Sequence, residues 1–377
     1  MKIPILRIPY DQEDISFIKN EVEKVLRSGY LTMADNVAKF ETEFAAFCGV
    51  KHALGTNSGT SSLEIVLRAI DVVGATVVVP SNTFMATPIS VVHAGGKVVF
   101  TDCERDNLQM DPDDLKRKIR KDTKAVIIVH IGGIISPRFE EIKRICKENG
   151  LFLLEDAAHA HGAAFKGTKA GNLGDAGSFS FYPTKVMTTA EGGMITTSDN
   201  FVYEQAIILR EHGKKDHSFN VHTEFGYNWR FSEIHAVLGL QQMRKIGWIL
   251  AERKKIASFY DQNIKRIKKL LPLRIASYVE PAYYKYVCFL ADGVDRATFK
   301  NKLKEKYEII LPGEVYSDPC HSQPVFEKYP QYVANDIKES FPNTDYVCRQ
   351  QVCLPLYPGL RTDELEYIMG ALEDCLK

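Results

Sequence analysis

The stretch Leu151-Phe152-Leu153-Leu154-Glu155-Asp156-Ala157-Ala158-His159 is an apolar run that ends in two carboxylates and a histidine. A continuously apolar run of this length is typical of a strand whose two faces are both covered by other elements. Ligands of open α/β sheets bind beyond the carboxyl ends of the strands, so Asp156 stands where an acid can take part in chemistry. An acid in this place can also simply cap a following helix, and the stretch alone leaves both roles open.

Similar apolar runs recur from residue 12 to about residue 245, and amphipathic helical stretches lie between them. Strands are predicted at residues 76–79, 97–102, 125–130, 151–156, 178–182 and 194–197. Helices are predicted at residues 61–70, 87–93, 113–119, 137–149 and 202–212. Because strands and helices alternate, we predict an α/β fold with a mostly parallel sheet that helices cover on both faces.

The pattern changes after residue 245, where a long basic helix is predicted from residue 246 to about residue 270. Short apolar segments follow, with further helices predicted at residues 297–308 and 363–376. We therefore predict two domains: a large domain over residues 1–245, which includes an N-terminal arm, and a smaller α+β domain over residues 246–377. No low-complexity linker separates them, so we expect the two domains to pack tightly.

The composition excludes several classes of protein. The 377 residues carry 48 Lys and Arg against 48 Asp and Glu, so no net positive charge attracts nucleic acid or an anionic membrane. The longest apolar runs have the length of strands, which argues against a transmembrane helix. The eight cysteines are scattered and form no C-x-x-C pair, as expected of buried thiols in a cytoplasmic protein.

Two segments carry side chains suited to holding and attacking a ligand. The first, Gly55-Thr56-Asn57-Ser58-Gly59-Thr60-Ser61-Ser62, runs into a predicted helix, whose free backbone N–H groups can bind a phosphate. The second, Ser178-Phe179-Ser180-Phe181-Tyr182-Pro183-Thr184-Lys185, places a lysine in a partly apolar setting that lowers its pKa and makes it a nucleophile. Taken singly, the first can be a plain helix cap, and Lys185 an ordinary surface lysine.

The combination of these features suits one cofactor, pyridoxal 5'-phosphate. The helix start would hold its phosphate, Asp156 would keep its pyridine nitrogen protonated, and Lys185 would form the Schiff base. Phe84 would offer an aromatic face to the ring. The pair His159-Ala160-His161 resembles two metal ligands, but no further histidine stands at a suitable spacing, so no metal is predicted.

Ordered blocks along nearly the whole chain resemble the fold-type I pyridoxal-phosphate aminotransferases of the DegT/StrS-like nucleotide-sugar group. The blocks include Ser58-Gly59-Thr60, Pro80-Ser81-Asn82-Thr83-Phe84-Met85-Ala86-Thr87, Glu155-Asp156-Ala157-Ala158-His159, Ser180-Phe181-Tyr182-Pro183-Thr184-Lys185, Gly226-Tyr227-Asn228-Trp229-Arg230 and His321-Ser322-Gln323-Pro324. The resemblance implies a PLP-transferase fold with a mostly parallel seven-stranded sheet and a smaller α+β C-terminal domain.

The resemblance also assigns roles to single residues. Lys185 is implied as the Schiff-base lysine and proton shuttle, and Asp156 as the partner of the pyridine nitrogen. The other implied cofactor contacts are Gly59, Thr60 and Ser180 at the phosphate, Phe84 and His159 at the ring, and Asn228 reaching from a neighbouring subunit. His321 and Tyr182 are implied as substrate contacts.

The function implied is transfer of an amino group, from glutamate, to a keto group of a nucleotide-linked deoxysugar, as in polysaccharide biosynthesis, by a homodimer with shared active sites. A small keto-cyclitol or keto-phosphate is the alternative acceptor. Rival functions are a sugar dehydratase, whose relatives carry His in place of the lysine, a metal-dependent hydrolase and a non-catalytic regulator. The block from His130 to Pro137 departs from the family pattern, and we expect it near the substrate mouth.

Overall fold

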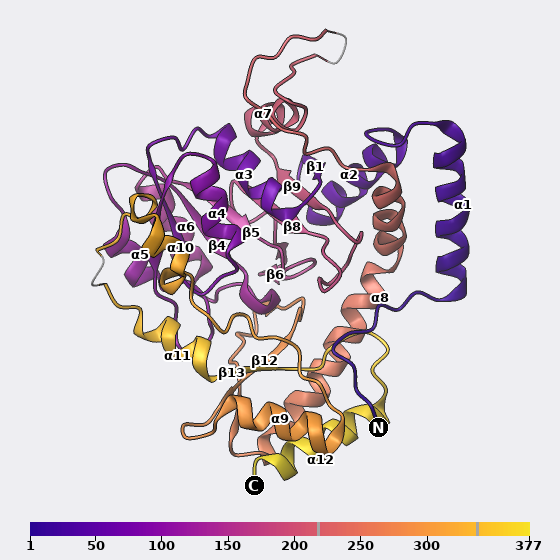
Figure 1. The fold of residues 1–377 in the computed structure, drawn as a ribbon, viewed down its shortest axis with the longest axis vertical. Coiled ribbons are helices and arrows are strands. Elements are labelled where there is room, and N and C mark those ends of the chain that lie inside the picture. The colour runs from indigo at the N-terminus through magenta and orange to yellow at the C-terminus, as the bar shows by residue number, and fades with distance from the viewer. Residues whose placement is uncertain (217–218, 337–338) are drawn as a thin grey trace.

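The computed structural model of the protein describes residues 1–216, 219–336 and 339–377. At its centre lies a seven-stranded sheet with the order β1-β9-β8-β5-β4-β2-β3 (Figure 1). The strands are β1 (His52–Thr56), β2 (Thr76–Pro80), β3 (Lys97–Thr101), β4 (Thr123–Val129), β5 (Phe152–Asp156), β8 (Ala176–Ser180) and β9 (Gly193–Thr197). β9 runs antiparallel to β1 and β8, and the other neighbours in the sheet are parallel. The predicted mostly parallel sheet is confirmed, and β1 is an additional strand that the apolar runs did not indicate.

Helices pack around this sheet and bury its strands (Figure 1). They are α2 (Asp35–Cys48), α3 (Gly59–Ala69), α4 (Ala86–His93), α5 (Pro112–Lys118), α6 (Phe139–Glu148) and α7 (Asn200–Arg210). In α6, the apolar residues Phe139, Ile142, Ile145 and Cys146 recur at helical spacing, and all four are buried. Every residue of β2 is buried as well, as the continuously apolar sequence predicted.

A long helix, α8 (Glu233–Asn263), begins 13 residues before the predicted start at residue 246. Ser232 caps it by accepting a hydrogen bond from the backbone N–H of Ile234. The Glu233 carboxylate in turn accepts backbone N–H groups of Ala34 and Val37 at the start of α2. This first part of α8 also contacts α1 (Gln12–Ser28). The predicted domain boundary at residue 245 lies inside α8, and the division into two domains stays a prediction.

The C-terminal region adds two small sheets and several helices. Its elements are β10 (Leu270–Pro272), β11 (Val279–Glu280), β12 (Tyr286–Leu290), α9 (Arg296–Tyr307), α10 (Pro324–Lys328), α11 (Pro342–Gln350), β13 (Gln351–Leu354) and α12 (Thr362–Cys375). β12 lies between β10 and β13, and β11 extends the hairpin of β6 (Ala164–Phe165) and β7 (Thr168–Lys169).

The β12 strand belongs to two hydrophobic cores at once. Val287 and Phe289 pack into the large core that surrounds the seven-stranded sheet. Tyr286, Cys288 and Leu290 pack into a second core with α9 and α12. The alternation of side chains along a strand explains this division, because successive residues point to opposite faces.

The N-terminal arm crosses to the C-terminal region, although the sequence analysis grouped it with the large domain. Ile3 is fully buried, and its backbone forms a parallel bridge with Ile309. The Arg7 guanidinium donates two hydrogen bonds to the Glu364 carboxylate, at 2.9 and 2.6 Å. Residues 3–7 therefore tie the beginning of the chain to the region around α9 and α12.

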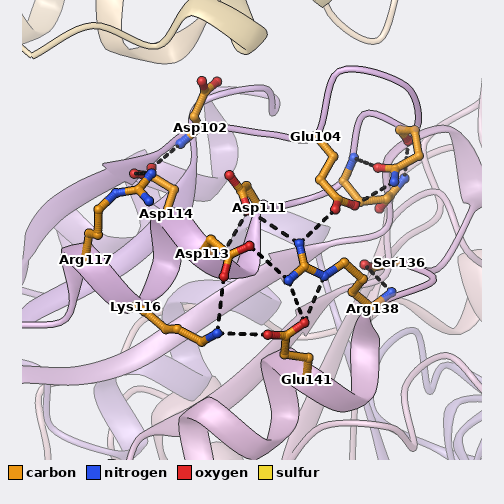
Figure 2. A network of polar contacts seen from close by, with 12 residues as sticks. Asp102, Glu104, Asp111, Asp113, Asp114, Lys116, Arg117, Ser136, Arg138 and Glu141 are labelled. Carbon is orange, nitrogen blue, oxygen red and sulfur yellow. Dashed lines mark hydrogen bonds and ion pairs between the residues drawn. The ribbon is translucent and has the colours of Figure 1, made fainter.

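Arg138 joins α5 and α6 at the surface (Figure 2). Its guanidinium forms ion pairs with Glu104, Asp113 and Glu141 at 3.2, 3.0 and 2.7 Å. Lys116 of α5 bridges Asp113 and Glu141 in the same network. These pairs hold α5 against the beginning of α6, on the side of the sheet where β3, β2 and β4 lie.

All eight cysteines lie in the part of the chain that the structure describes, and all are free thiols. Seven of them are buried, as predicted for most of the thiols, and Cys375 is half-buried, while the cytoplasmic location stays a prediction. None of the described helices combines the length and the apolar character that crossing a membrane requires.

Glu155, directly before the candidate site residue Asp156, is fully buried and has a partner for each carboxylate oxygen. Oε1 accepts the backbone N–H groups of Leu173 and Gly174 at 2.8 and 2.7 Å. Oε2 accepts the N–H of Gly171 at 2.9 Å and faces His130 Nε2 at 2.8 Å. One side chain thus fixes the loop before β8 against β5.

We expect Glu155→Gln to destabilise the protein by about 3 kcal/mol, because an amide group turns an N–H toward donors that need an acceptor. Urea denaturation measures the change in the free energy of unfolding. The exposed Glu148→Gln is the matched control and should stay within about 0.5 kcal/mol of the parent protein. Equal losses in the two variants would contradict the role given to Glu155.

Candidate active site

A cavity of about 430 Å³ opens at the edge of the sheet where β1, β2, β4, β5 and β8 end. Eight of the ten predicted site residues line it, and they come from four separate segments of the chain. They are Gly59, Thr60, Phe84, Asp156, His159, Ser180, Tyr182 and Lys185. The prediction that these residues come together is therefore confirmed by geometry, while their roles stay predictions.

The start of α3 forms one end of the cavity. Ser58 caps the helix by accepting the N–H of Ser61, so the N–H groups of the first residues remain directed out of the helix. Gly59 lies so close to β8 that a Cβ atom would come within 2.8 Å of the Ser180 Cβ. A helix start with a nearby hydroxyl and no side chain in between can bind a phosphate.

Asp156 lies at the end of β5 and is 6% exposed. Its Oδ2 accepts a hydrogen bond from Thr87 Oγ1 at 2.8 Å, and its Oδ1 accepts the backbone N–H of Ala158 at 3.2 Å. Burial raises the pKa of the Asp156 carboxyl, while these hydrogen bonds and the nearby Lys185 oppose the rise.

Lys185 follows β8 and faces the cavity from the turn that Tyr182 begins. Burial lowers the pKa of the Lys185 amine below its usual value, and the Asp156 carboxylate works in the opposite direction. The Lys185 Nζ lies 5.1 Å from the centre of the Tyr284 ring. Tyr284 is held there by the contact of its hydroxyl with Thr184 Oγ1 at 3.1 Å.

His159 forms the inner wall of the cavity. Its ring stacks on Tyr284 with the ring centres 4.1 Å apart, and its Nε2 lies 3.0 Å from the Tyr316 hydroxyl. Its other ring nitrogen, Nδ1, is buried and has no hydrogen-bond partner among the described residues. A ligand in the cavity can supply that partner.

Tyr284 and Tyr316 were not predicted, and neither was the contact of Thr87 with Asp156. Both tyrosines come from the C-terminal region, where no pattern in the sequence marks them as site residues. Thr87 stands in a block quoted above, but only the fold shows that its hydroxyl faces Asp156.

Asn228 and His321 do not line the cavity of this subunit. Asn228 is exposed, and its reach to a neighbouring subunit stays a prediction. The His321 ring contacts Ser81 Oγ at 2.7 Å and packs on Phe341, with the ring centres 4.5 Å apart. The substrate contact predicted for His321 therefore has no support in the geometry of the cavity, and its role stays a prediction.

The segment from Ile131 to Ser136 is buried and does not line the cavity, so its place near the substrate mouth stays a prediction. The Gly133 carbonyl accepts the N–H of Ala282. A Cβ at Gly133 would come within 2.6 Å of the His159 carbonyl and 2.9 Å of the Tyr284 nitrogen. The segment thus acts indirectly, since it allows the loop with Tyr284 to approach the end of β5.

No group of His, Cys, Asp and Glu side chains suited to a metal ion occurs within residues 1–216, 219–336 and 339–377. His161, the second histidine of the predicted H-x-H pair, is fully buried beside Phe44, Phe179 and Phe181. Burial lowers the pKa of His161 to about 3, so its ring stays neutral.

The lowered pKa of Lys185 can be tested on protein freed of any bound ligand. We expect the rate of reductive methylation of Lys185 to rise at lower pH than that of the exposed Lys24, since its amine is neutral at lower pH. Asp156→Asn should lower the midpoint further, because it removes a charge that stabilises the ammonium. Peptide mass spectrometry gives both pH profiles, and coincident midpoints for Lys24 and Lys185 would refute the assignment.

Known proteins resemble this chain along its length. GDP-perosamine synthase of Vibrio cholerae is 28% identical over 99% of this chain and 98% of its own length. The spore coat polysaccharide biosynthesis protein SpsC of Bacillus subtilis (strain 168) is 33% identical over 95% of this chain and 94% of its own. Spr1654 of Streptococcus pneumoniae, assigned as a sugar aminotransferase and solved in its PLP form, has a TM-score of 0.90 at 25% identity, covering 100% of this chain and 98% of that one.

A family model also matches nearly the whole chain. It describes the DegT/DnrJ/EryC1/StrS aminotransferases and extends over residues 12–373, which includes every strand of the central sheet and every side chain that lines the cavity. The resemblance inferred from the sequence blocks is confirmed. This chain belongs to the DegT/DnrJ/EryC1/StrS aminotransferase family.

Proposed function

We propose that this chain is a pyridoxal-phosphate-dependent aminotransferase that moves an amino group, from glutamate, to a keto group of a nucleotide-linked deoxysugar. The observation that carries the proposal is the meeting of Lys185 and Asp156 in one buried cavity, beside a helix start able to hold a phosphate. Membership in an aminotransferase family supports the reaction class.

The residues present fit pyridoxal phosphate at each of its polar positions. The start of α3, with Gly59, Thr60 and Ser180, suits the phosphate, and Asp156 suits the ring nitrogen. The unpartnered Nδ1 of His159 suits the phenolic oxygen. Phe84, which lines the cavity and is 58% exposed, offers a face for the ring.

When bound, pyridoxal phosphate supplies a carbonyl that condenses with amines and a ring that withdraws electrons from the neighbouring carbon. Lys185 provides an amine that is neutral at lower pH than usual, so it can bond to that carbonyl. The Lys185 amine would then take the proton from the donor carbon bonded to the transferred nitrogen and deliver it to the carbon on the other side of that nitrogen. Asp156 holds a proton on the ring nitrogen throughout.

The keto-sugar acceptor is supported by the relatives, two of which are named for sugar metabolism. Among the described residues that line the cavity, Lys185 carries the cationic side chain, and we assign that amine to the cofactor. The diphosphate of a sugar nucleotide would therefore lie outside the cavity, beyond the half-exposed Tyr182. A small keto-cyclitol or keto-phosphate is the alternative acceptor, and glutamate remains our proposed donor.

Features of the site weigh against the rival functions. Lys185 occupies the place where dehydratase relatives are expected to carry His, which argues against dehydration. A zinc hydrolase needs a metal site, and the described residues offer none. A regulator without catalysis has no need of a lysine of lowered pKa that faces a buried carboxylate.

The homodimer is supported by exposed apolar side chains near Asn228. Phe219, Phe225 and Tyr227 are 64%, 94% and 50% exposed, on a hairpin that extends from the body of the protein beyond α7 (Figure 1). Exposed large apolar side chains along one short segment are typical of a protein contact. We propose that this hairpin meets a second copy and carries Asn228 to the phosphate of that copy's cofactor.

Substituting Lys185→Ala should reduce amino transfer by about 10³-fold or more, because no other amine in the cavity can replace it. Mass spectrometry of products from glutamate and a panel of keto-sugar nucleotides, keto-cyclitols and keto-phosphates measures the loss and identifies the acceptor. Lys166→Ala, at an exposed lysine paired with Glu140, is the control and should keep full activity. Native turnover by Lys185→Ala would end the proposal.

Sharing of active sites can be tested by mixing subunits. Lys185→Ala and Asn228→Ala subunits are each expected to be impaired alone. In a mixed dimer, one site combines the intact Lys185 of one subunit with the intact Asn228 of the other, so about a quarter of the activity should return if subunits mix at random. If Asn228 serves its own subunit, mixing restores nothing.

A further inference from the structure

The hydroxyls of two threonines, Thr83 and Thr87, form a chain of hydrogen bonds that ends at the Asp156 carboxylate. Thr87 Oγ1 donates to Asp156 Oδ2 at 2.8 Å, and Thr83 Oγ1 lies 2.8 Å from Thr87 Oγ1. All three residues are buried, with exposures of 2% for Thr83, 0% for Thr87 and 6% for Asp156. Thr83 and Thr87 flank the same turn that carries Phe84 into the cavity.

The number of hydroxyl hydrogens determines which group donates in each of these two hydrogen bonds. A threonine hydroxyl has one hydrogen, and Thr87 gives its hydrogen to the ionised carboxylate of Asp156. Thr87 must therefore accept in its contact with Thr83, and Thr83 must donate. Both hydroxyl hydrogens thus point toward Asp156, as expected where a negative charge is to be stabilised.

We propose that Thr87, oriented by Thr83, is a positioning residue that keeps Asp156 ionised and in place for the ring nitrogen of the cofactor. The inference rests on the proposed function, since it needs Asp156 to hold a proton on that nitrogen. It assigns a role to Thr87, which is fully buried and does not line the cavity, and to Thr83, which orients it.

The need for such a pair follows from the surroundings of Asp156. Burial alone raises the pKa of this carboxyl, and a protonated carboxyl could not hold the ring nitrogen charged. The groups that oppose protonation are the Thr87 hydroxyl, the Ala158 N–H, the Lys185 amine and His130. Lys185 opposes protonation of Asp156 only while its nitrogen is charged, and burial lowers the pKa of its amine, whereas the Thr87 hydroxyl can donate in either case.

The size of the effect follows from the charge on the acceptor. A hydrogen bond to a buried charged group changes an equilibrium about tenfold or more, which is about one unit of pKa. Without Thr87, the carboxyl pKa rises, the pair between carboxylate and ring nitrogen weakens, and the pKa of the ring nitrogen falls. Binding of the cofactor should weaken by a similar factor.

The experiment uses the whole enzyme loaded with pyridoxal phosphate labelled with ¹⁵N in the ring. The ¹⁵N chemical shift reports protonation of the ring nitrogen directly, and equilibrium dialysis gives the cofactor Kd. The variants are Thr87→Val, which keeps the shape and removes the donor, and Thr87→Ser, which restores the hydroxyl. Thr76→Val is the matched control, a buried threonine at the opposite end of β2.

In Thr87→Val, the ring nitrogen should lose its proton about one pH unit lower than in the parent, and the cofactor Kd should rise about tenfold. Thr87→Ser and Thr76→Val should match the parent in both measurements. Thr83→Val leaves the hydrogen bond from Thr87 to Asp156 in place and should give a smaller shift in the same direction. This variant also tests the inference if Thr87→Val does not fold.

Asp156→Asn separates failure of the inference from failure of the proposed function. If Asp156→Asn changes the ring-nitrogen titration and Thr87→Val or Thr83→Val leaves it as in the parent, the role of the threonine pair is overturned. If Asp156→Asn itself leaves the titration unchanged, Asp156 is not the partner of the ring, and the proposed role of Asp156 falls together with the inference. Equal shifts in Thr87→Val and Thr76→Val would show a general structural effect and also overturn it.

Discussion

Two consecutive carboxylates at the end of β5 must point to opposite faces of the sheet, and both are buried. A buried charge requires partners, and the fold supplies a different set on each side. Glu155 receives backbone N–H groups from the loop before β8 together with His130. Asp156 receives Thr87 and the Ala158 N–H on the side of the cavity. Glu155 therefore holds the loop before β8 in place, and Asp156 remains available to a ligand in the cavity.

Much of the site could be predicted because parallel strands bring their carboxyl ends to one edge. Asp156 and Ser180 end β5 and β8, whose apolar runs predicted strands, and Gly59 begins a predicted helix after a turn-rich segment. Local sequence indicates such positions, while the roles of Gly59, Thr60 and Ser180 were assigned by the family resemblance. The mostly parallel sheet was predictable for the same reason, since its strands are buried on both faces and read as continuous apolar runs.

The remaining features depend on contacts between distant segments. Tyr284 and Tyr316 enter the cavity from the C-terminal region through packing against His159, which no local pattern reports. The early start of α8 reflects the capping of α2 by Glu233, another distant contact. His321 and the segment after His130 were placed by analogy with relatives, whereas the ring of His321 packs on Ser81 and Phe341.

The division of β12 between two cores bears on how this protein can be re-engineered. Val287 and Phe289 face one core, while Tyr286, Cys288 and Leu290 face the other, and Tyr284 lies just before the strand in the wall of the cavity. A chimera that takes its C-terminal half from a relative would have to match both packing surfaces simultaneously. The C-terminal half is therefore not an exchangeable module, and recombination should favour crossovers that keep β12 with both of its cores.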